Sequence, residues 1–342
     1  IGGHGPSTDG IDVDSSSNIL IENCDIDCND DNFCLKAGRD ADGLRINRPT
    51  EYVVIRNCIS RAGGGLLTCG SETSGGIRYV LAEGLKAKDT TVGIRLKSAM
   101  NRGGTTSHIY IKDIELNDVG TAFEASTNWN PAYSYSKLPK EYDNKPIPSH
   151  WMKMLEKVDE KNGIPYFHDI YLSDLKINNA KTFMNVSGCK ESVMKNFSFE
   201  NIDANVEKIG KVDYAQDWTF LNTKIKATNL QPLKITNSKQ VQLPSKEDTY
   251  TNEFPHQLKA KKQNSSILAA NNPEFTFLLP EMSGSLKLGI IKDKESKWLS
   301  QLNTIDCRQN DKQANYTLAD PILGNGQLAI KAVSLTDTDG II

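Results

Sequence analysis

Apolar and polar residues alternate in short segments that recur along most of the chain. The clearest segments are residues 18–24, 52–58, 77–84, 108–114, 168–175, 192–199 and 217–222. Alternation over such lengths predicts half-buried β-strands. Each segment ends near Asn, Asp or Gly, which tolerate the left-handed backbone that turns a chain. The segments start at intervals of about 23 to 34 residues, with one longer gap, and this spacing is typical of one coil of a solenoid.

Short strands at regular spacing also suit a β-sandwich or a propeller. A coiled stack is favoured because asparagine recurs at the same place in two coils, Asn23 and Asn57, and because Asn-Gly hairpin turns are largely missing between strands. We therefore predict an all-β fold, a right-handed parallel β-helix over residues 1–260. Only residues 151–161 show a persuasive helical period.

Two regions depart from the coil pattern. The longest gap, residues 127–166, carries six aromatic residues and five prolines. A long insertion on a rigid scaffold is commonly functional, and aromatic faces suit the apolar faces of sugar rings. Packing onto the scaffold is the alternative use. Residues 259–266 read as a linker, and the strand-like segments 274–279, 285–291 and 327–333 lack corner asparagines. We predict a small β-sandwich-like module over residues 267–342.

Three carboxylates stand out against this scaffold. Asp9 lies in Ser-Thr-Asp-Gly, and Asp30 and Asp31 follow 21 and 22 positions later in Asn-Asp-Asp-Asn. Residues one coil apart lie above one another, so the three side chains should share one surface. Crowded carboxylates spread their pKa values, and one can stay protonated while another is ionised. Hydrolysis of a sugar–sugar bond needs that division between acid and base. Taken singly, these motifs are ordinary turns.

Charge and cysteine content exclude several classes of protein. The chain has 40 Lys and Arg against 43 Asp and Glu, so it lacks the excess of positive charge that is typical of nucleic-acid-binding proteins. No apolar run reaches the length of a membrane span, and residues 1–6 do not form a signal peptide. The seven cysteines are an odd number without zinc-finger spacing, so we expect neither a full disulfide framework nor a metal site. No cofactor is predicted.

With these motifs in order, residues 7–245 resemble glycoside hydrolase family 28, the polygalacturonases and related pectin hydrolases. Residues 7–10 stand for its Asn-Thr-Asp-Gly motif, residues 30–31 for Asp-Asp and residues 95–97 for Arg-Ile-Lys. Residues 35–43 look like the bacterial exo-acting branch. The sequence differs from the family at the Gly-His-Gly motif, because residues 63–65 are all glycine. We take Gly65 as the position where the family has histidine.

The resemblance implies an inverting glycosidase that acts on a pectic, uronate-containing polysaccharide or oligosaccharide. Asp30 matches the general acid, and Asp9 and Asp31 match the carboxylates that activate water. The implied substrate-binding residues are Arg95 and Lys97, with Lys36, Arg39 and Gly65 as further candidates. An alternating Arg-x-Lys pair projects both cations from one face of a strand, where arginine can bind a carboxylate bidentately. The family also implies a secreted or periplasmic location.

Two other functions stay open at this point. A pectate lyase-like β-helix enzyme would hold calcium at its carboxylates and use a basic residue to remove a proton. A non-catalytic carbohydrate-binding β-helix would fit the glycine at the histidine position. The family also has several coils before its first motif, whereas this sequence has almost none. We therefore expect a partner chain or a further segment to cover the edge of the first coil.

Overall fold

The computed structural model describes residues 2–229, 231–241, 256–259, 266–269, 273–279, 282–292, 295–309 and 313–333. The chain divides into two compact units, residues 1–17 with 21–246 and residues 18–20 with 247–342. The predicted linker over residues 259–266 lies mostly outside the described residues. Among the helices that are described, none is both long and apolar enough to cross a membrane.

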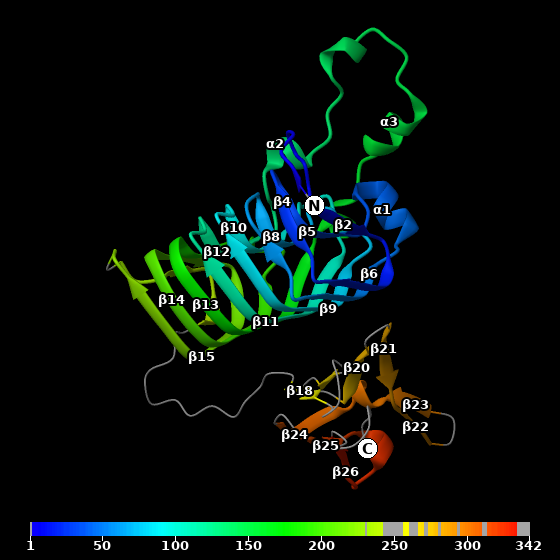
Figure 1. The fold of residues 1–342 in the computed structure, drawn as a ribbon. Helices are drawn as coiled ribbons and strands as arrows, with labels where there is room; N and C mark the ends of the chain where they lie inside the picture. The colour runs from blue at the N-terminus through cyan, green and yellow to red at the C-terminus, as the bar shows by residue number, and fades with distance from the viewer. Residues whose placement is uncertain are drawn as a thin grey trace. The chain divides into compact units, whose positions relative to one another are not determined.

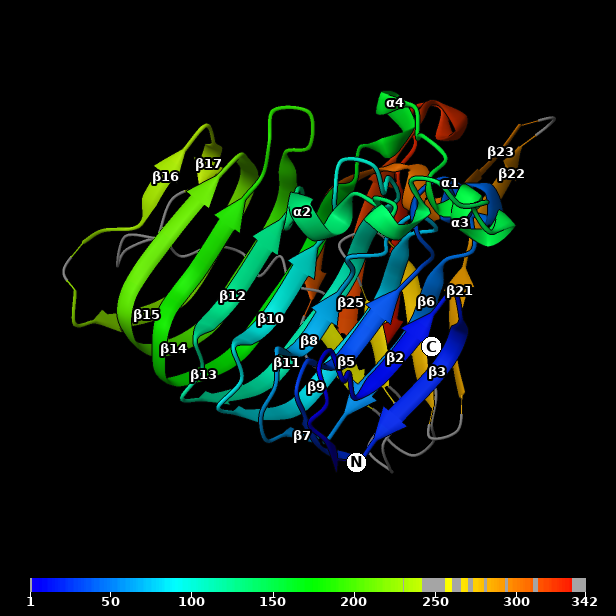
Figure 2. The ribbon, with the colours of Figure 1, turned by 90° about the horizontal axis from the view of Figure 1, so that it is seen from above.

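The first unit is a stack of parallel strands wound into coils (Figures 1 and 2). Its strands are β1 (Gly2–Gly3), β2 (Ile11–Asp14), β3 (Ser17–Glu22), β4 (Asp25–Cys28), β5 (Asp31–Lys36), β6 (Thr50–Arg56), β7 (Ile59–Ser60), β8 (Gly65–Cys69), β9 (Ile77–Lys88), β10 (Val92–Lys97), β11 (Thr105–Asn117), β12 (Thr121–Ser126), β13 (Tyr166–Ser187), β14 (Met194–Asp213), β15 (Ala215–Ala227), β16 (Lys234–Thr236) and β17 (Lys239–Val241).

Strand pairing sorts these elements into three faces. One face runs through β2, β5, β8, β10 and β12, then through the ends of β13 and β14 to β16. The second runs from β3 and β6 through the starts of β9, β11, β13 and β14 to β15 and β17. The third begins with β1, β4 and β7 and continues in the second half of β9. The predicted parallel β-helix is confirmed.

Polar corners and a stacked apolar interior hold the coils together. Asn23 and Asn57 have φ of 55° and 53°, the left-handed conformation that asparagine tolerates at a corner. Further along, Asn178 donates its amide to Asn117 at 2.9 Å, an asparagine ladder between neighbouring coils. Inside, Phe197 stacks on Trp218 with ring centroids 4.4 Å apart. Such repeated contacts between like residues fix the register of each coil on the next.

Short helices interrupt the strands at a few places. They are α1 (Asp40–Ile46), α2 (Pro131–Ser134), α3 (Ser149–Met154) and α4 (Glu160–Gly163), with the 3₁₀ turn η1 (Lys140–Tyr142). The helical period over residues 151–161 falls on two short helices, α3 and α4, because Asp159 caps a new helix by accepting a hydrogen bond from Lys161 N at 2.9 Å. The alternation-based reading missed α1, which follows β5 directly.

The second unit consists of antiparallel sheets. Its strands are β18 (His256–Lys259), β19 (Ser266–Ala269), β20 (Glu274–Leu279), β21 (Met282–Lys287), β22 (Gly289–Lys292), β23 (Glu295–Trp298), β24 (Asn303–Gln309), β25 (Gln313–Ala319) and β26 (Leu328–Val333), with the 3₁₀ turns η2 (Leu299–Gln301) and η3 (Pro321–Leu323). A core around Tyr316, Leu318 and Phe275 packs this unit. The strand expected over residues 285–291 is two strands, broken at Leu288.

Candidate active site

The two carboxylate motifs lie on adjacent coils of the first face. Strands β2 and β5 pair in parallel with an offset of 22 residues, and the turns that precede them carry Asp9 and Asp30. Two backbone hydrogen bonds lock the turns together, from Asp30 N to Thr8 O at 3.0 Å and from Gly10 N to Asp31 O at 2.9 Å. The structure therefore brings the three predicted acidic residues to neighbouring positions on one surface.

Asp31 is the most strongly held of these carboxylates. It is 2% exposed and accepts hydrogen bonds from Thr68 Oγ1 at 2.8 Å, Arg95 Nη1 at 3.0 Å and Lys97 Nζ at 2.9 Å. Burial alone would raise the pKa of Asp31, but the opposite charges of Lys97 and Arg95 outweigh it and the pKa lies below its usual value. Asp31 is therefore ionised at neutral pH.

The two cations also contact other side chains. Arg95 and Lys97 flank the buried Leu96 on β10, so both project from the outer side of the face. Arg95 Nε donates to Glu124 Oε1 at 3.1 Å, and Lys97 Nζ lies 4.4 Å from the ring centroid of Trp129. Sequence patterns gave no signal for Glu124, although its pairing with Arg95 in the parallel register places it there.

Asp9 has a different environment. Lys36 Nζ lies 3.0 Å from Asp9 Oδ2 and 2.7 Å from Asp12 Oδ2. Burial raises the pKa of Asp9; the contact with Lys36 opposes this, and the charges of Asp12 and Asp30 add to it. Asp9 thus binds a proton more readily than an ordinary aspartate. Lys36, a predicted contact for a substrate anion, forms ion pairs with both of these carboxylates.

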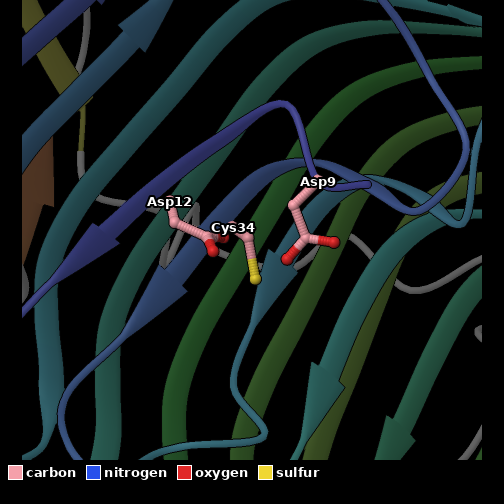
Figure 3. Close-up of side chains that lie close together, drawn as sticks. All are labelled: Asp9, Asp12 and Cys34. Carbon is pink, nitrogen blue, oxygen red and sulfur yellow. The ribbon is translucent and has the colours of Figure 1, made fainter. Parts of the chain in front are cut away.

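Asp9, Asp12 and Cys34 lie close together in Figure 3, and one oxygen of each carboxylate and the Cys34 sulfur lie within 4.8 Å of one another. Burial raises the pKa of the Cys34 thiol well above its usual value, and the thiolate is the form that binds metals. The ammonium group of Lys36 already contacts both carboxylates. These donors fit an ion-pair cluster better than a metal site.

The run of three glycines borders the acids. A Cβ atom on Gly64 would lie 2.8 Å from Asp30 Oδ1 and 3.3 Å from Asp31 Oδ1. Gly65 is buried, and a Cβ there would meet Thr68 Oγ1 at 2.6 Å and Asp31 Oδ1 at 2.8 Å. A side chain at Gly64 would therefore meet the carboxyl group of the half-buried Asp30, whereas one at Gly65, our predicted histidine position, would meet Asp31.

With this geometry in view, comparison with known sequences is informative. Residues 2–132 match the sequence profile of glycosyl hydrolases family 28. The matched part, which we call the family 28 segment, contains all three candidate acids and both cations. Residues 279–342 match a second profile, described as a domain of unknown function (DUF4450).

Two curated relatives of the family 28 segment carry polygalacturonase names. A "Probable polygalacturonase" from Vitis vinifera is 37% identical over 145 residues, which are 42% of this chain and 28% of that protein. An "Exo-poly-alpha-D-galacturonosidase" from Dickeya chrysanthemi is 29% identical over 140 residues, 39% of this chain and 23% of that one. The chain spans about a quarter of the length of these curated relatives.

Two solved exopolygalacturonase structures share the fold. A hyperthermoactive exopolygalacturonase from Thermotoga maritima aligns with a TM-score of 0.51 and 24% identity over 68% of this chain and 45% of that chain. A family 28 exopolygalacturonase from Yersinia enterocolitica aligns with a TM-score of 0.50 and 18% identity over 68% and 38% of the two chains. These likenesses show the parallel β-helix.

Arg39, the remaining residue that we predicted to bind substrate, contacts the insertion. Its Nη2 lies 3.3 Å from Ser134 O and 3.2 Å from Ser136 Oγ, and its Nε lies 3.3 Å from Asp40 Oδ2. These contacts occupy the guanidinium with protein groups. Arg39 therefore ties the insertion to the scaffold, a role that spacing in the sequence did not indicate.

Proposed function

We propose that this chain is an inverting glycoside hydrolase of pectic, uronate-containing glycans. The observation that carries the proposal is the set of three carboxylates on adjacent coils beside two cations, Arg95 and Lys97. The polygalacturonase names of the two curated relatives support a pectic substrate. Production of reducing ends from a panel of pectic oligosaccharides, including rhamnogalacturonan fragments, tests it.

The environments of the three acids suggest their roles. Asp30 is half-buried and has no ion pair among the described residues, so its carboxyl group is left to face the leaving glycosidic oxygen, and we assign it the role of general acid. Asp9 has the raised pKa, which makes it the stronger base toward the proton of the attacking water. Asp31, ionised and fixed by two cations, orients that water and stabilises the positive charge that develops at the sugar. Attack from the opposite side breaks the C1–O bond with inversion.

The uronate specificity rests on Lys97. One of its three N–H groups points to Asp31, which leaves donors for a substrate carboxylate. We expect Lys97→Ala to lower kcat/KM more on a uronate substrate than on a neutral analogue, by at least about 1.5 kcal/mol. Lys86→Ala, a change at an exposed lysine on β9, is the control. Equal losses on charged and neutral substrates would remove Lys97 from this role.

Two glycine variants distinguish an effect on the catalytic acid from an effect on the stability of the fold. Gly64→Ala places a methyl group 2.8 Å from Asp30 Oδ1 and 3.2 Å from the backbone carbonyl carbon of Asp30. We expect about 10- to 10²-fold lower kcat because the acid is displaced, with a smaller loss of stability than for Gly65→Ala. Gly65→Ala crowds the locked pair of Thr68 and Asp31, so we expect it to lower the melting temperature as well. The assignment of Asp30 fails if Gly64→Ala is fully active.

The two alternatives and the location are tested separately. A lyase-like enzyme would release unsaturated product and lose activity with a chelator, whereas hydrolysis by carboxylates does neither. A purely carbohydrate-binding protein would bind pectic fragments without turnover. We also propose a secreted or periplasmic location, because a polymeric substrate lies outside the cytoplasm; fractionation of the source cells checks it.

A further inference from the structure

The insertion brings two aromatic side chains to the candidate active site. Trp129 lies under the ammonium group of Lys97, 4.4 Å from ring centroid to Nζ. Tyr133, the third residue of α2, packs edge-on against Trp129 with centroids 5.7 Å apart. Trp129 is half-buried, and Tyr133 is 59% exposed. An aromatic surface thus extends from the Asp31–Lys97 pair into solvent.

Hydrogen bonds fix the backbone that carries this surface. Trp129 N donates to Ser98 O at 2.7 Å, which joins the insertion to the residue just after β10. The buried hydroxyl of Ser134 donates to Trp129 O at 2.6 Å. Both ends of the short Trp129–Ser134 segment are therefore tied down, and the two rings are held in place before any ligand arrives.

Two arginines bind the end of this segment. Arg39 Nη2 and Arg102 Nη1 both donate to Ser134 O, at 3.3 and 3.0 Å. Both also contact the buried carboxylate of Asp40 at the start of α1. Arg102 is fully buried. These ion pairs and hydrogen bonds join Asp40, the two arginines and Ser134 O into one cluster that ties the insertion to the scaffold.

We propose that Trp129 and Tyr133 form an aromatic subsite for the pyranose ring of a uronate whose carboxylate contacts Lys97, with Arg39 and Arg102 as positioning residues. The ammonium group over Trp129 recognises the carboxylate while the aromatic surface covers the apolar C–H face of the same or the adjoining sugar. Large rigid rings with few rotatable bonds give such contact at low entropic cost. The proposal rests on the proposed function, since it names how that site holds its substrate.

The same insertion offers matched controls. Tyr142 and Trp151 form a second aromatic pair within the insertion, with ring centroids 4.9 Å apart. Tyr166 is another exposed tyrosine, at the start of β13. Neither Trp151 nor Tyr166 is in the Trp129–Tyr133 pair, so Trp151→Phe and Tyr166→Ala change an aromatic side chain without changing the proposed subsite.

The test measures binding of trigalacturonate by calorimetry in an Asp30→Asn background of the full chain. We expect Tyr133→Ala to raise Kd about three- to tenfold, Trp129→Leu to raise it about tenfold or more, and Trp129→Phe to fall between parent and Trp129→Leu. The two control variants should bind like the parent. Parent-like affinity in both Tyr133→Ala and Trp129→Leu would overturn the subsite.

Turnover by the unmutated acid separates this proposal from the proposed function. In the protein with Asp30 intact, Arg39→Lys should raise KM severalfold and leave kcat close to that of the parent. The reason is that the change loosens the segment that carries Trp129 and Tyr133 and does not touch the acids. A fall in kcat without a change in KM would overturn the positioning role. Binding that follows the expected order without any turnover would contradict the hydrolase proposal and support the subsite. Turnover together with parent-like binding by the Trp129 and Tyr133 variants would support the hydrolase proposal and contradict the subsite.

Discussion

Asp30→Asn is expected to lower turnover on a pectic oligosaccharide about 10²- to 10⁴-fold, the usual contribution of a positioned general acid. The amide has the shape of the carboxyl group but cannot donate the proton that the leaving oxygen needs. Initial rates of reducing-end release give the ratio, and circular dichroism checks that the β-helix is retained.

Asp203→Asn serves as the matched control, because Asp203 is an exposed residue of β14 outside the candidate site. It should keep parent activity. Retention of more than about a tenth of the activity by Asp30→Asn would mean that another group supplies the proton.

Asp31→Asn is expected to destabilise the folded protein by about 3–5 kcal/mol at neutral pH, because it leaves two nearly buried cations without their counter-charge. The pKa of Asp31 is lowered in the folded state. Its ionised form therefore contributes stability above the unfolded pKa, near 3.8, and this contribution is lost as pH falls through the folded pKa. Urea unfolding at pH 7 and near pH 3 measures the gap between variant and parent, which should shrink at the lower pH.

Asp9→Asn provides the contrast. Because the pKa of Asp9 is raised on folding, its ionised form costs stability above the folded pKa, and its removal is expected to change the unfolding free energy by less than about 1 kcal/mol. Lys36 keeps Asp12 as a partner. A loss for Asp9→Asn as large as that for Asp31→Asn would contradict the separate environments of the two acids.

The sequence predicted the parts of this protein that depend on local pattern. Alternating segments ending at asparagine predicted the coils, since a strand buried on one face must alternate and a corner needs residues that tolerate positive φ. The one-coil spacing likewise predicted that Asp9, Asp30 and Asp31 would meet. It could not give the hydrogen bonds that join the two turns, such as the one from Gly10 N to Asp31 O.

What the sequence could not predict depends on contacts between distant segments. Lys36 and Arg39 looked like free cations, but the fold brings Asp12 to one and Ser134 to the other. The position of Gly64 beside Asp30 follows from where a Cβ would point, which three consecutive glycines do not reveal. Trp129 was one aromatic residue among six in the insertion until the structure placed it at Lys97.

The most direct test is the anomeric configuration of the first product, followed by proton NMR during hydrolysis of an oligogalacturonide. Asp30 as acid, with Asp9 and Asp31 directing water to the opposite face of the sugar, predicts that the first product appears with the inverted configuration and then mutarotates. A first product with the configuration of the substrate would require a covalent glycosyl-enzyme intermediate and would contradict this arrangement of the three carboxylates.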